Sequence, residues 1–208
     1  MSLVLIRHGK SVWNLENKFT GWYDIELAPE GMIEAEKAAS FLADNEFKPD
    51  VCFTSYLQRA NKTLEIILNH MPVKMVKDIE IIKSWKLNER HYGALQGLNK
   101  DDTKNKYGEQ KFLEWRRSYN IPPPILDEDS IMNPKNDPIY ENENTDELPL
   151  TECLKDTYDR VVPYWTSEIK PLILEKDVMI AAHGNSLRAL CKFLFDIEDD
   201  DIVNLEIP

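Results

Sequence analysis

Residues 3–14 read LVLIRHGKSVWN, and this stretch decides the class of fold. The apolar run at residues 2–6 predicts a buried strand. A cation, an imidazole and a residue without a side chain follow at once, as Arg7, His8 and Gly9. A polar loop after a strand is the simplest interpretation. The more specific one is a phosphate site in which His8 is the nucleophile and Gly9 lets the backbone approach the phosphate closely.

The same pattern recurs near the end of the chain. VMIAA at residues 178–182 predicts another strand, and it runs directly into His183 and Gly184. Parallel strands bring their carboxyl ends to one edge of a sheet, where ligands bind, so His8 and His183 can lie close together. A single histidine at a strand end would more simply be a hydrogen-bonded boundary residue. Two matching patterns favour a shared site.

Short apolar segments alternate with helical patterns along the chain. This alternation predicts an α/β fold with a mostly parallel central sheet and helices on both faces. Ser55 and Gln58 have the spacing of a capping box, and Asn185 is the expected N-cap of the last helix. The predicted third strand is DVCFTS at residues 50–55, and the predicted helices are residues 29–45, 55–70, 152–165, 166–176 and 185–195.

The length of 208 residues suits one domain spanning residues 1–208. Residues 119–150 are rich in Pro, Asn and Asp and predict a long irregular excursion. Such a segment is either a lid over the site or a surface loop without function.

Composition excludes several classes of partner. The net charge of −12 argues against nucleic acid or an anionic membrane. No apolar stretch approaches the ~20 residues that a bilayer requires, and the N-terminus lacks a signal-peptide pattern. The three cysteines are far apart in the sequence, which fits a reducing cytoplasm better than a disulfide framework.

Cationic residues complete the candidate phosphate site. Arg59 follows the strand at residues 50–55, where a helix N-terminus would also attract an anion. We expect Arg7, Arg59 and a protonated His183 to stabilise the charge of a transferring phosphoryl group. Neutral imidazole already has a free lone pair near pH 7, so His8 needs no strong base to act as nucleophile. Each of these residues alone would more simply be a surface or boundary group.

The segment SWKLNERHYGALQGLNK at residues 84–100 is polar and aromatic. It supplies Glu89, the candidate general acid/base, although an isolated glutamate is usually a solvated carboxylate. Further on, Arg116 and Arg117 form a basic pair that could clamp a substrate carboxylate or simply face solvent. No Gly-rich phosphate loop and no short metal motif is present, so a metal-free mechanism is the simpler interpretation. A metal site built from His8, His183 and Glu89 is the alternative.

Six segments together carry a family resemblance. They are LIRHGKSVWNLENKFTGWYDIELAPEG at residues 5–31, TSYLQRANKT at 54–63, WKLNERHYGALQGLNK at 85–100, WRRSYNIPPP at 115–124, LPLTECLKDTYDRVVPYW at 148–165 and AAHGNSLRALCK at 181–192. In this order they resemble the cofactor-dependent (2,3-bisphosphoglycerate-dependent) phosphoglycerate mutases of the histidine phosphatase superfamily. The R-H-G motif alone marks only the superfamily, whereas LNERHYGALQGLNK and WRRSYNIPPP are specific to the mutase branch.

The resemblance implies an isomerase of glycolysis and gluconeogenesis that interconverts 3-phosphoglycerate and 2-phosphoglycerate. His8 would carry the phosphoryl group, 2,3-bisphosphoglycerate would prime it, and no metal would take part. The implied catalytic residues are His8, Glu89, His183, Arg7 and Arg59. The implied substrate-binding residues are Asn14, Thr20, Gly21, Tyr92, Lys100, Arg116, Arg117, Gly184 and Asn185.

The resemblance also implies a cytoplasmic homodimer or homotetramer whose partners are small phosphoglycerates. The family continues with a further strand and a tail, and we expect both to be absent from this chain after Pro208. Two alternatives share the same phosphate-binding residues. One is a phosphohydrolase of the same superfamily, in which water clears the phosphohistidine, and the other is a non-catalytic descendant. Residues 88–100 and 115–124 favour the mutase, since a mutase must hold a bisphosphate while it reorients.

Overall fold

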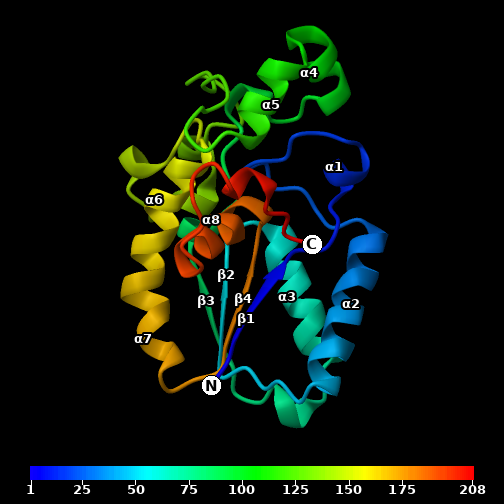
Figure 1. The fold of residues 1–208 in the computed structure, drawn as a ribbon. Coiled ribbons are helices and arrows are strands. Elements are labelled where there is room, and N and C mark those ends of the chain that lie inside the picture. Colours follow the sequence, from blue (N-terminus) through cyan, green and yellow to red (C-terminus); the bar gives the residue numbers. More distant parts are fainter.

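The computed structural model describes all residues 1–208 and contains one four-stranded sheet (Figure 1). The strand order is β1-β4-β2-β3, and every neighbouring pair is parallel. The α/β class predicted from the sequence is therefore confirmed. The strands are β1 (Leu3–Arg7), β2 (Val51–Thr54), β3 (Glu80–Lys83) and β4 (Val178–Ala182).

Helices cover both faces of the sheet, as expected (Figure 1). α2 and α3 lie on one face, and α6, α7 and α8 lie on the other. The helices are α1 (Val12–Leu15), α2 (Pro29–Asp44), α3 (Gln58–His70), α4 (Lys100–Tyr107), α5 (Glu109–Arg117), α6 (Leu154–Tyr164), α7 (Lys170–Ile173) and α8 (Gly184–Leu194). A π-helical turn over Trp165–Ile169 joins α6 to α7, so the two helical stretches predicted for this region are continuous.

The two central strands are buried on both faces, which explains their nearly continuous apolar sequence. Successive side chains of a strand point to opposite faces. In β4, Met179 and Ala181 therefore pack with α2 and α3, whereas Val178 and Ile180 pack with α6 and α8. Both cores consist mainly of aliphatic side chains, and together they fix the sheet between its two helical layers.

Some local predictions were wrong. The sequence analysis missed β3, because this short edge strand is mostly exposed and lacks an apolar run. α3 begins at Gln58 with Leu57 at the N-cap position, so the Ser55–Gln58 capping box does not form. Asn185 lies inside α8, whose N-cap position is held by His183.

The excursion predicted at residues 119–150 contains only short 3₁₀ turns beyond the end of α5. It packs through Tyr140 and Leu148 against Trp22 and Trp85. The Asn88 amide donates to the Tyr140 hydroxyl at 2.8 Å, and Trp85 Nε1 donates to the Glu143 carboxylate at 3.0 Å. The segment is thus attached to residues 84–92, which lead into the candidate site.

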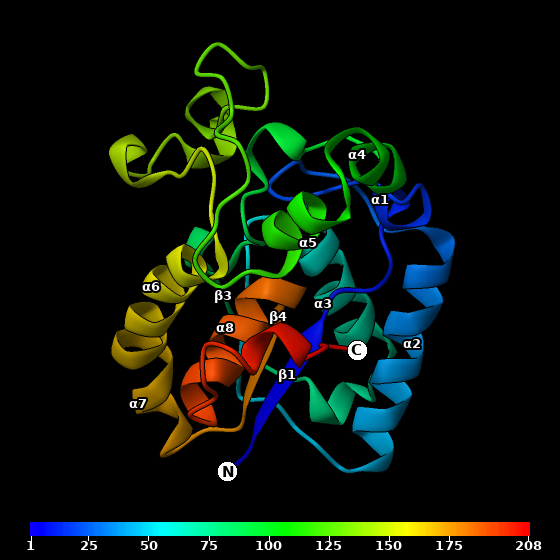
Figure 2. The same cartoon turned by 45° about the horizontal axis from the view of Figure 1, so that its top comes forward.

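The register of the strands brings distant residues together. Arg7 pairs with Ala182, so His8 and His183 follow as neighbours beyond the ends of β1 and β4. Thr54 pairs with Ala181, which places Ser55 beside the same position. Figure 2 shows α4 and α5 beyond this end of the sheet, where α8 also begins. None of the helices is long and apolar enough to span a bilayer.

Candidate active site

A cavity of about 230 Å³ opens at the carboxyl edge of the sheet. The residues predicted to bind or transform a phosphate converge on it. His183 does not line the cavity itself but packs directly behind His8, with ring centroids 4.9 Å apart. The other predicted residues that line it are Arg7, His8, Asn14, Thr20, Gly21, Arg59, Glu89, Tyr92, Lys100, Arg116, Arg117, Gly184 and Asn185.

His8 is held in one tautomer. Its backbone N–H donates to the Ala182 carbonyl, and its ring Nδ1 donates to the Gly9 carbonyl at 2.7 Å. Burial, reinforced by the charges of Arg59 and Arg7, lowers the pKa of His8 well below 6.5. The ring is therefore neutral, and with the proton on Nδ1 the lone pair lies on Nε2. This is the state that a nucleophilic imidazole requires.

His183 is fully buried, and Ser55 contacts it from the end of β2. Ser55 Oγ lies 2.7 Å from His183 Nε2 and also accepts the Leu57 N–H. Burial and the charge of Arg59 lower the pKa of His183, which favours a neutral ring over the protonated His183 expected from the sequence. Its Nδ1 is buried without a partner in the protein. A neutral His183 can still contribute an N–H donor at this atom.

Arg59 supplies a fixed positive charge beneath the cavity. Its guanidinium is almost completely buried and donates to the carbonyls of Gly21 at 2.7 Å and Tyr23 at 3.1 Å. Burial lowers the pKa of Arg59 to about 10, which leaves it charged at neutral pH. Its Nε–H and the Thr20 hydroxyl are buried without partners. Both can serve an anion, because buried donors normally require an acceptor.

Glu89 presents one carboxylate oxygen as a proton site. Its Oε1 accepts the backbone N–H groups of Arg90 at 2.8 Å and Asn185 at 3.1 Å. No protein donor contacts Oε2, which faces the side where Arg7 and Gly184 lie. Glu89 thus has one anchored oxygen and one free oxygen, the arrangement that general acid/base catalysis needs.

Tyr92 and Asn185 form the wall beside Glu89. The Asn185 amide donates to the Tyr92 hydroxyl at 3.3 Å, and the Arg90 guanidinium lies 4.5 Å from the Tyr92 ring. Burial alone would raise the pKa of Tyr92, but the charge of Arg90 brings it below its usual value. Burial lowers the pKa of Lys100, which lines the same cavity. These polar groups surround a site already rich in cations.

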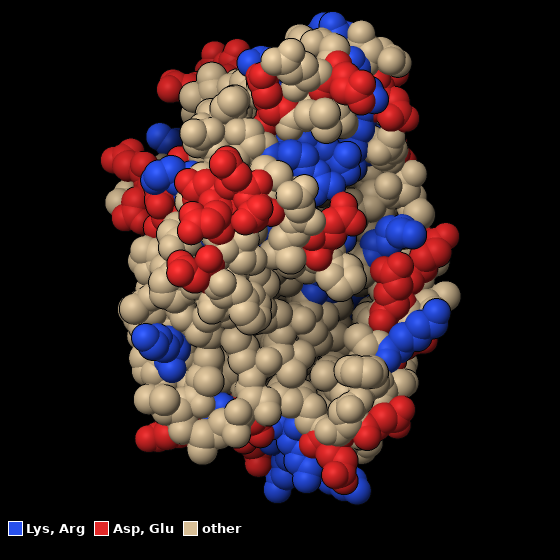
Figure 3. All heavy atoms as spheres, in the orientation of Figure 1, with Lys and Arg blue, Asp and Glu red and all other residues tan.

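The cavity reverses the charge of the whole chain. Seven cationic side chains line it and only two carboxylates, those of Glu89 and Glu206. Figure 3 shows Lys and Arg gathered below α4 near the end of α5, with acidic side chains spread over the surrounding surface. Such a cavity concentrates a polyanionic substrate despite the net charge of −12.

Sequence reasoning missed several lining residues. Lys18 and Arg188 add positive charge, and Phe19 forms part of the wall. Arg188 lies on α8 and donates to the Asn185 side chain at 3.2 Å, so its position one turn after the H-G-N motif was an available signal. No residue of the 119–150 excursion lines the cavity. The structure therefore shows no contact through which this segment would act as a lid over the site.

A glycine is needed at position 9 for a different reason from the one expected from the sequence. A Cβ at Gly9 would lie 2.2 Å from the Gly31 carbonyl oxygen, so the glycine allows the start of α2 to approach. Gly9 does not line the phosphate-sized cavity. Its N–H donates to Thr63 on α3. Packing against α2 and α3, rather than close approach to a ligand, therefore requires the glycine.

Comparison with known proteins places this geometry in a family. Residues 3–208 match the histidine phosphatase superfamily (branch 1). The chain belongs to this superfamily. It is 53% identical over 207 residues to proteins named 2,3-bisphosphoglycerate-dependent phosphoglycerate mutase from Borreliella burgdorferi and Borrelia garinii subsp. bavariensis. Each alignment covers 99% of this chain and 82% of the relative, and it confirms the resemblance inferred from the sequence segments.

Solved structures share the fold at much lower identity. A putative alpha-ribazole-5'-P phosphatase from Escherichia coli has a TM-score of 0.72 and 17% identity, with coverage of 100% of this chain and 86% of that one. A mycobacterial glucosyl-3-phosphoglycerate phosphatase has a TM-score of 0.68 and 22% identity, with coverage of 98% and 84%. These likenesses concern the fold alone and do not separate mutase from phosphatase chemistry.

Proposed function

We propose that this protein interconverts 3-phosphoglycerate and 2-phosphoglycerate through a phosphohistidine at His8, primed by 2,3-bisphosphoglycerate. The observation that carries the proposal is the neutral His8 ring, with its Nε2 lone pair free, inside a cationic cavity beside Glu89. Relatives that bear the mutase name at 53% identity support the same activity.

In the proposed first step, His8 Nε2 attacks a phosphorus atom of 2,3-bisphosphoglycerate. The N–P bond forms as the bond from phosphorus to the glycerate oxygen breaks. Glu89 Oε2 gives its proton to the leaving oxygen. In the transfer to 3-phosphoglycerate, Glu89 takes the proton of the 2-hydroxyl as that oxygen attacks the phosphohistidine. His8 Nε2 then attacks the 3-phosphate of the bisphosphate so formed, and Glu89 returns its proton to the leaving 3-oxygen. This releases 2-phosphoglycerate and restores the phosphohistidine for the next cycle.

Fixed donors stabilise the phosphoryl group during transfer. Arg7 and Arg59 supply charge, and the His183 Nδ1–H supplies a neutral donor when the Ser55 hydroxyl donates to Nε2. The buried unpaired Nε–H of Arg59 fits a phosphate oxygen. Donors that are already oriented need no rearrangement as charge develops, which is the main source of such catalysis.

The outer cations suit the second charged end of the substrate. Arg116 and Arg117 lie in the last turn of α5, and Lys100 lies at the start of α4, all on the wall of the cavity. We assign them to the carboxylate and the non-reacting phosphate, so that the bisphosphate can reorient without leaving. We further propose that the protein works in the cytoplasm, consistent with three unpaired cysteines. The resemblance to the mutases also leads us to propose a homodimer or homotetramer.

A coupled enzyme assay tests the proposal. Interconversion of the two monophosphates should depend on added 2,3-bisphosphoglycerate, persist in a chelator and vanish in His8→Ala. Loss of turnover in the chelator would favour the metal alternative. Faster release of inorganic phosphate than interconversion would favour the phosphohydrolase, and neither activity would favour the non-catalytic descendant.

A further inference from the structure

A buried ion pair lies behind the segment that carries Glu89. Arg160 is on α6 and Glu152 precedes that helix, and their side chains are only 7% and 3% exposed. Arg160 Nε donates to Glu152 Oε1 at 2.6 Å, and Nη2 donates to Oε2 at 2.9 Å. The contact is therefore bidentate, the strongest geometry for these two groups. Neither residue lines the cavity.

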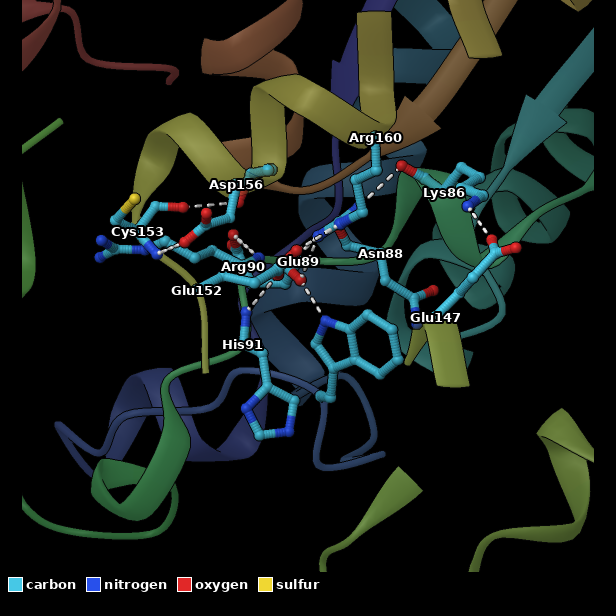
Figure 4. Close-up of polar contacts among 12 residues, drawn as sticks. Lys86, Asn88, Glu89, Arg90, His91, Glu147, Glu152, Cys153, Asp156 and Arg160 are labelled. Atoms are coloured by element: carbon cyan, nitrogen blue, oxygen red, sulfur yellow. Dashed lines mark hydrogen bonds and ion pairs between the residues drawn. The ribbon is translucent and has the colours of Figure 1, made fainter. Parts of the chain in front are cut away.

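The pair holds the backbone on both sides of Glu89 (Figure 4). Arg160 donates to the carbonyls of Lys86 at 2.7 Å, Asn88 at 3.0 Å and Glu89 at 2.9 Å. Glu152 accepts the His91 N–H at 2.8 Å through Oε2, and its own N–H donates to the His91 carbonyl at 2.8 Å.

This segment has no other regular support. Residues 88–92 belong to neither a helix nor a strand, so no secondary-structure ladder fixes their backbone. The Trp22 indole also donates to the Glu89 carbonyl, and the Arg160 guanidinium lies 5.7 Å from the Trp22 ring. Arg160 and Glu152 therefore supply much of the support for the backbone that carries the Glu89 carboxylate.

We propose that Arg160 and Glu152 are positioning residues for Glu89. They hold its backbone so that Oε1 meets the N–H groups of Arg90 and Asn185 and Oε2 stays free toward the reacting phosphate. The inference rests on the proposed role of Glu89 in phosphoryl transfer. A purely structural pair would support folding but would not act through that carboxylate.

A double-mutant cycle separates these roles. Mutase turnover is measured for the wild type, Arg160→Lys, Glu89→Gln and the double variant, with the folded fraction of each determined by circular dichroism. Lysine keeps the charge but cannot make the bidentate contact and reach three carbonyls. We expect Arg160→Lys to lower kcat by roughly 10- to 100-fold, because a displacement of about 1 Å can cost about that much. In the Glu89→Gln background its effect should shrink to less than about threefold.

Lys86→Met is the matched control. It removes the surface contact with Glu147 from the same segment but leaves the Lys86 carbonyl for Arg160, so kcat should stay within about twofold of wild type.

Equal effects of Arg160→Lys in the wild-type and Glu89→Gln backgrounds would overturn the proposal, and so would an effect below about threefold in the wild-type background. If Arg160→Lys does not fold, Glu152→Gln replaces it in the cycle. Failure of both to fold would show that the pair only maintains the fold, which also overturns the proposal.

Failure of the proposed function gives a different result. In that case the wild type itself lacks interconversion dependent on 2,3-bisphosphoglycerate. The same cycle is then measured on phosphate release from 2,3-bisphosphoglycerate, the activity of the phosphohydrolase alternative. If the wild type shows neither activity, Glu89 has no catalytic role for the pair to support, and the proposal fails with it.

Discussion

Acidification should destabilise this protein strongly, because three histidines are buried in neutral form. Burial lowers the pKa of His8, His91 and His183, and nearby guanidinium groups lower it further. For His91 the pKa falls from 6.5 to about 3. The unfolded chain binds protons at these positions below pH 6.5, whereas the folded protein does not. Their stabilising effect is thus complete above pH 6.5 and is lost as the pH falls toward the folded pKa values.

The size of the effect follows from proton linkage. At pH 5, protonation of unfolded His91 lowers the free energy of unfolding by about 2 kcal/mol relative to high pH. Each of the other two histidines shifts in the same direction. Near pH 5.5, His91 alone adds about 1.2 kcal/mol per pH unit to the slope. The loss from His91 by pH 5 is already a substantial part of the 5–15 kcal/mol typical of a folded domain.

Urea unfolding followed by tryptophan fluorescence between pH 5 and 7.5 measures this slope. His91→Asn is the informative variant, since the asparagine oxygen can accept the Gly93 N–H in place of Nδ1. The slope near pH 5.5 should be smaller in the variant by about 1.2 kcal/mol per pH unit, independent of the stability of the variant at pH 7.5. A wild-type free energy that stays constant from pH 6.5 to 5, or an unchanged slope in His91→Asn, would refute the reasoning.

Three further substitutions test parts of the site. Glu89→Gln should lower turnover by about 10²- to 10⁴-fold while His8 still accepts phosphate, and an unchanged rate would remove Glu89 from the mechanism. Ser55→Ala should lower turnover about tenfold, since losing a buried hydrogen-bond partner costs about 1–3 kcal/mol; Ser55→Thr, which keeps a hydroxyl, should retain more activity. Gly9→Ala should lower the free energy of unfolding by about 1–3 kcal/mol or more, because the new Cβ would lie 2.2 Å from the Gly31 oxygen. Denaturation midpoints measure this change, and an unaltered midpoint would contradict it.

The main architecture and the meeting of His8 with His183 could be predicted from the sequence. Buried parallel strands leave apolar runs, and a polar residue after such a run lies at a known edge of the sheet. β3 could not be predicted in this way, because it lies at the edge of the sheet and is largely exposed.

Residues whose roles depend on tertiary contacts were harder to predict. Ser55 has the spacing of a helix cap, yet the strand register directs its hydroxyl to His183. Arg160 and Glu152 lie more than 60 residues from the segment they support, and nothing local distinguishes them from surface charges on a helix. Their burial and their acceptors are visible only once the chain has folded.

Phosphorus NMR of the protein incubated with 2,3-bisphosphoglycerate tests the central claim most directly, since phosphate on the two ring nitrogens of histidine gives distinct signals. The account predicts one phosphohistidine signal, from Nε2 of His8, because the Gly9 carbonyl keeps the proton on Nδ1. The signal should be absent in His8→Ala. Phosphate on Nδ1, on His183, or on no histidine at all would contradict the account.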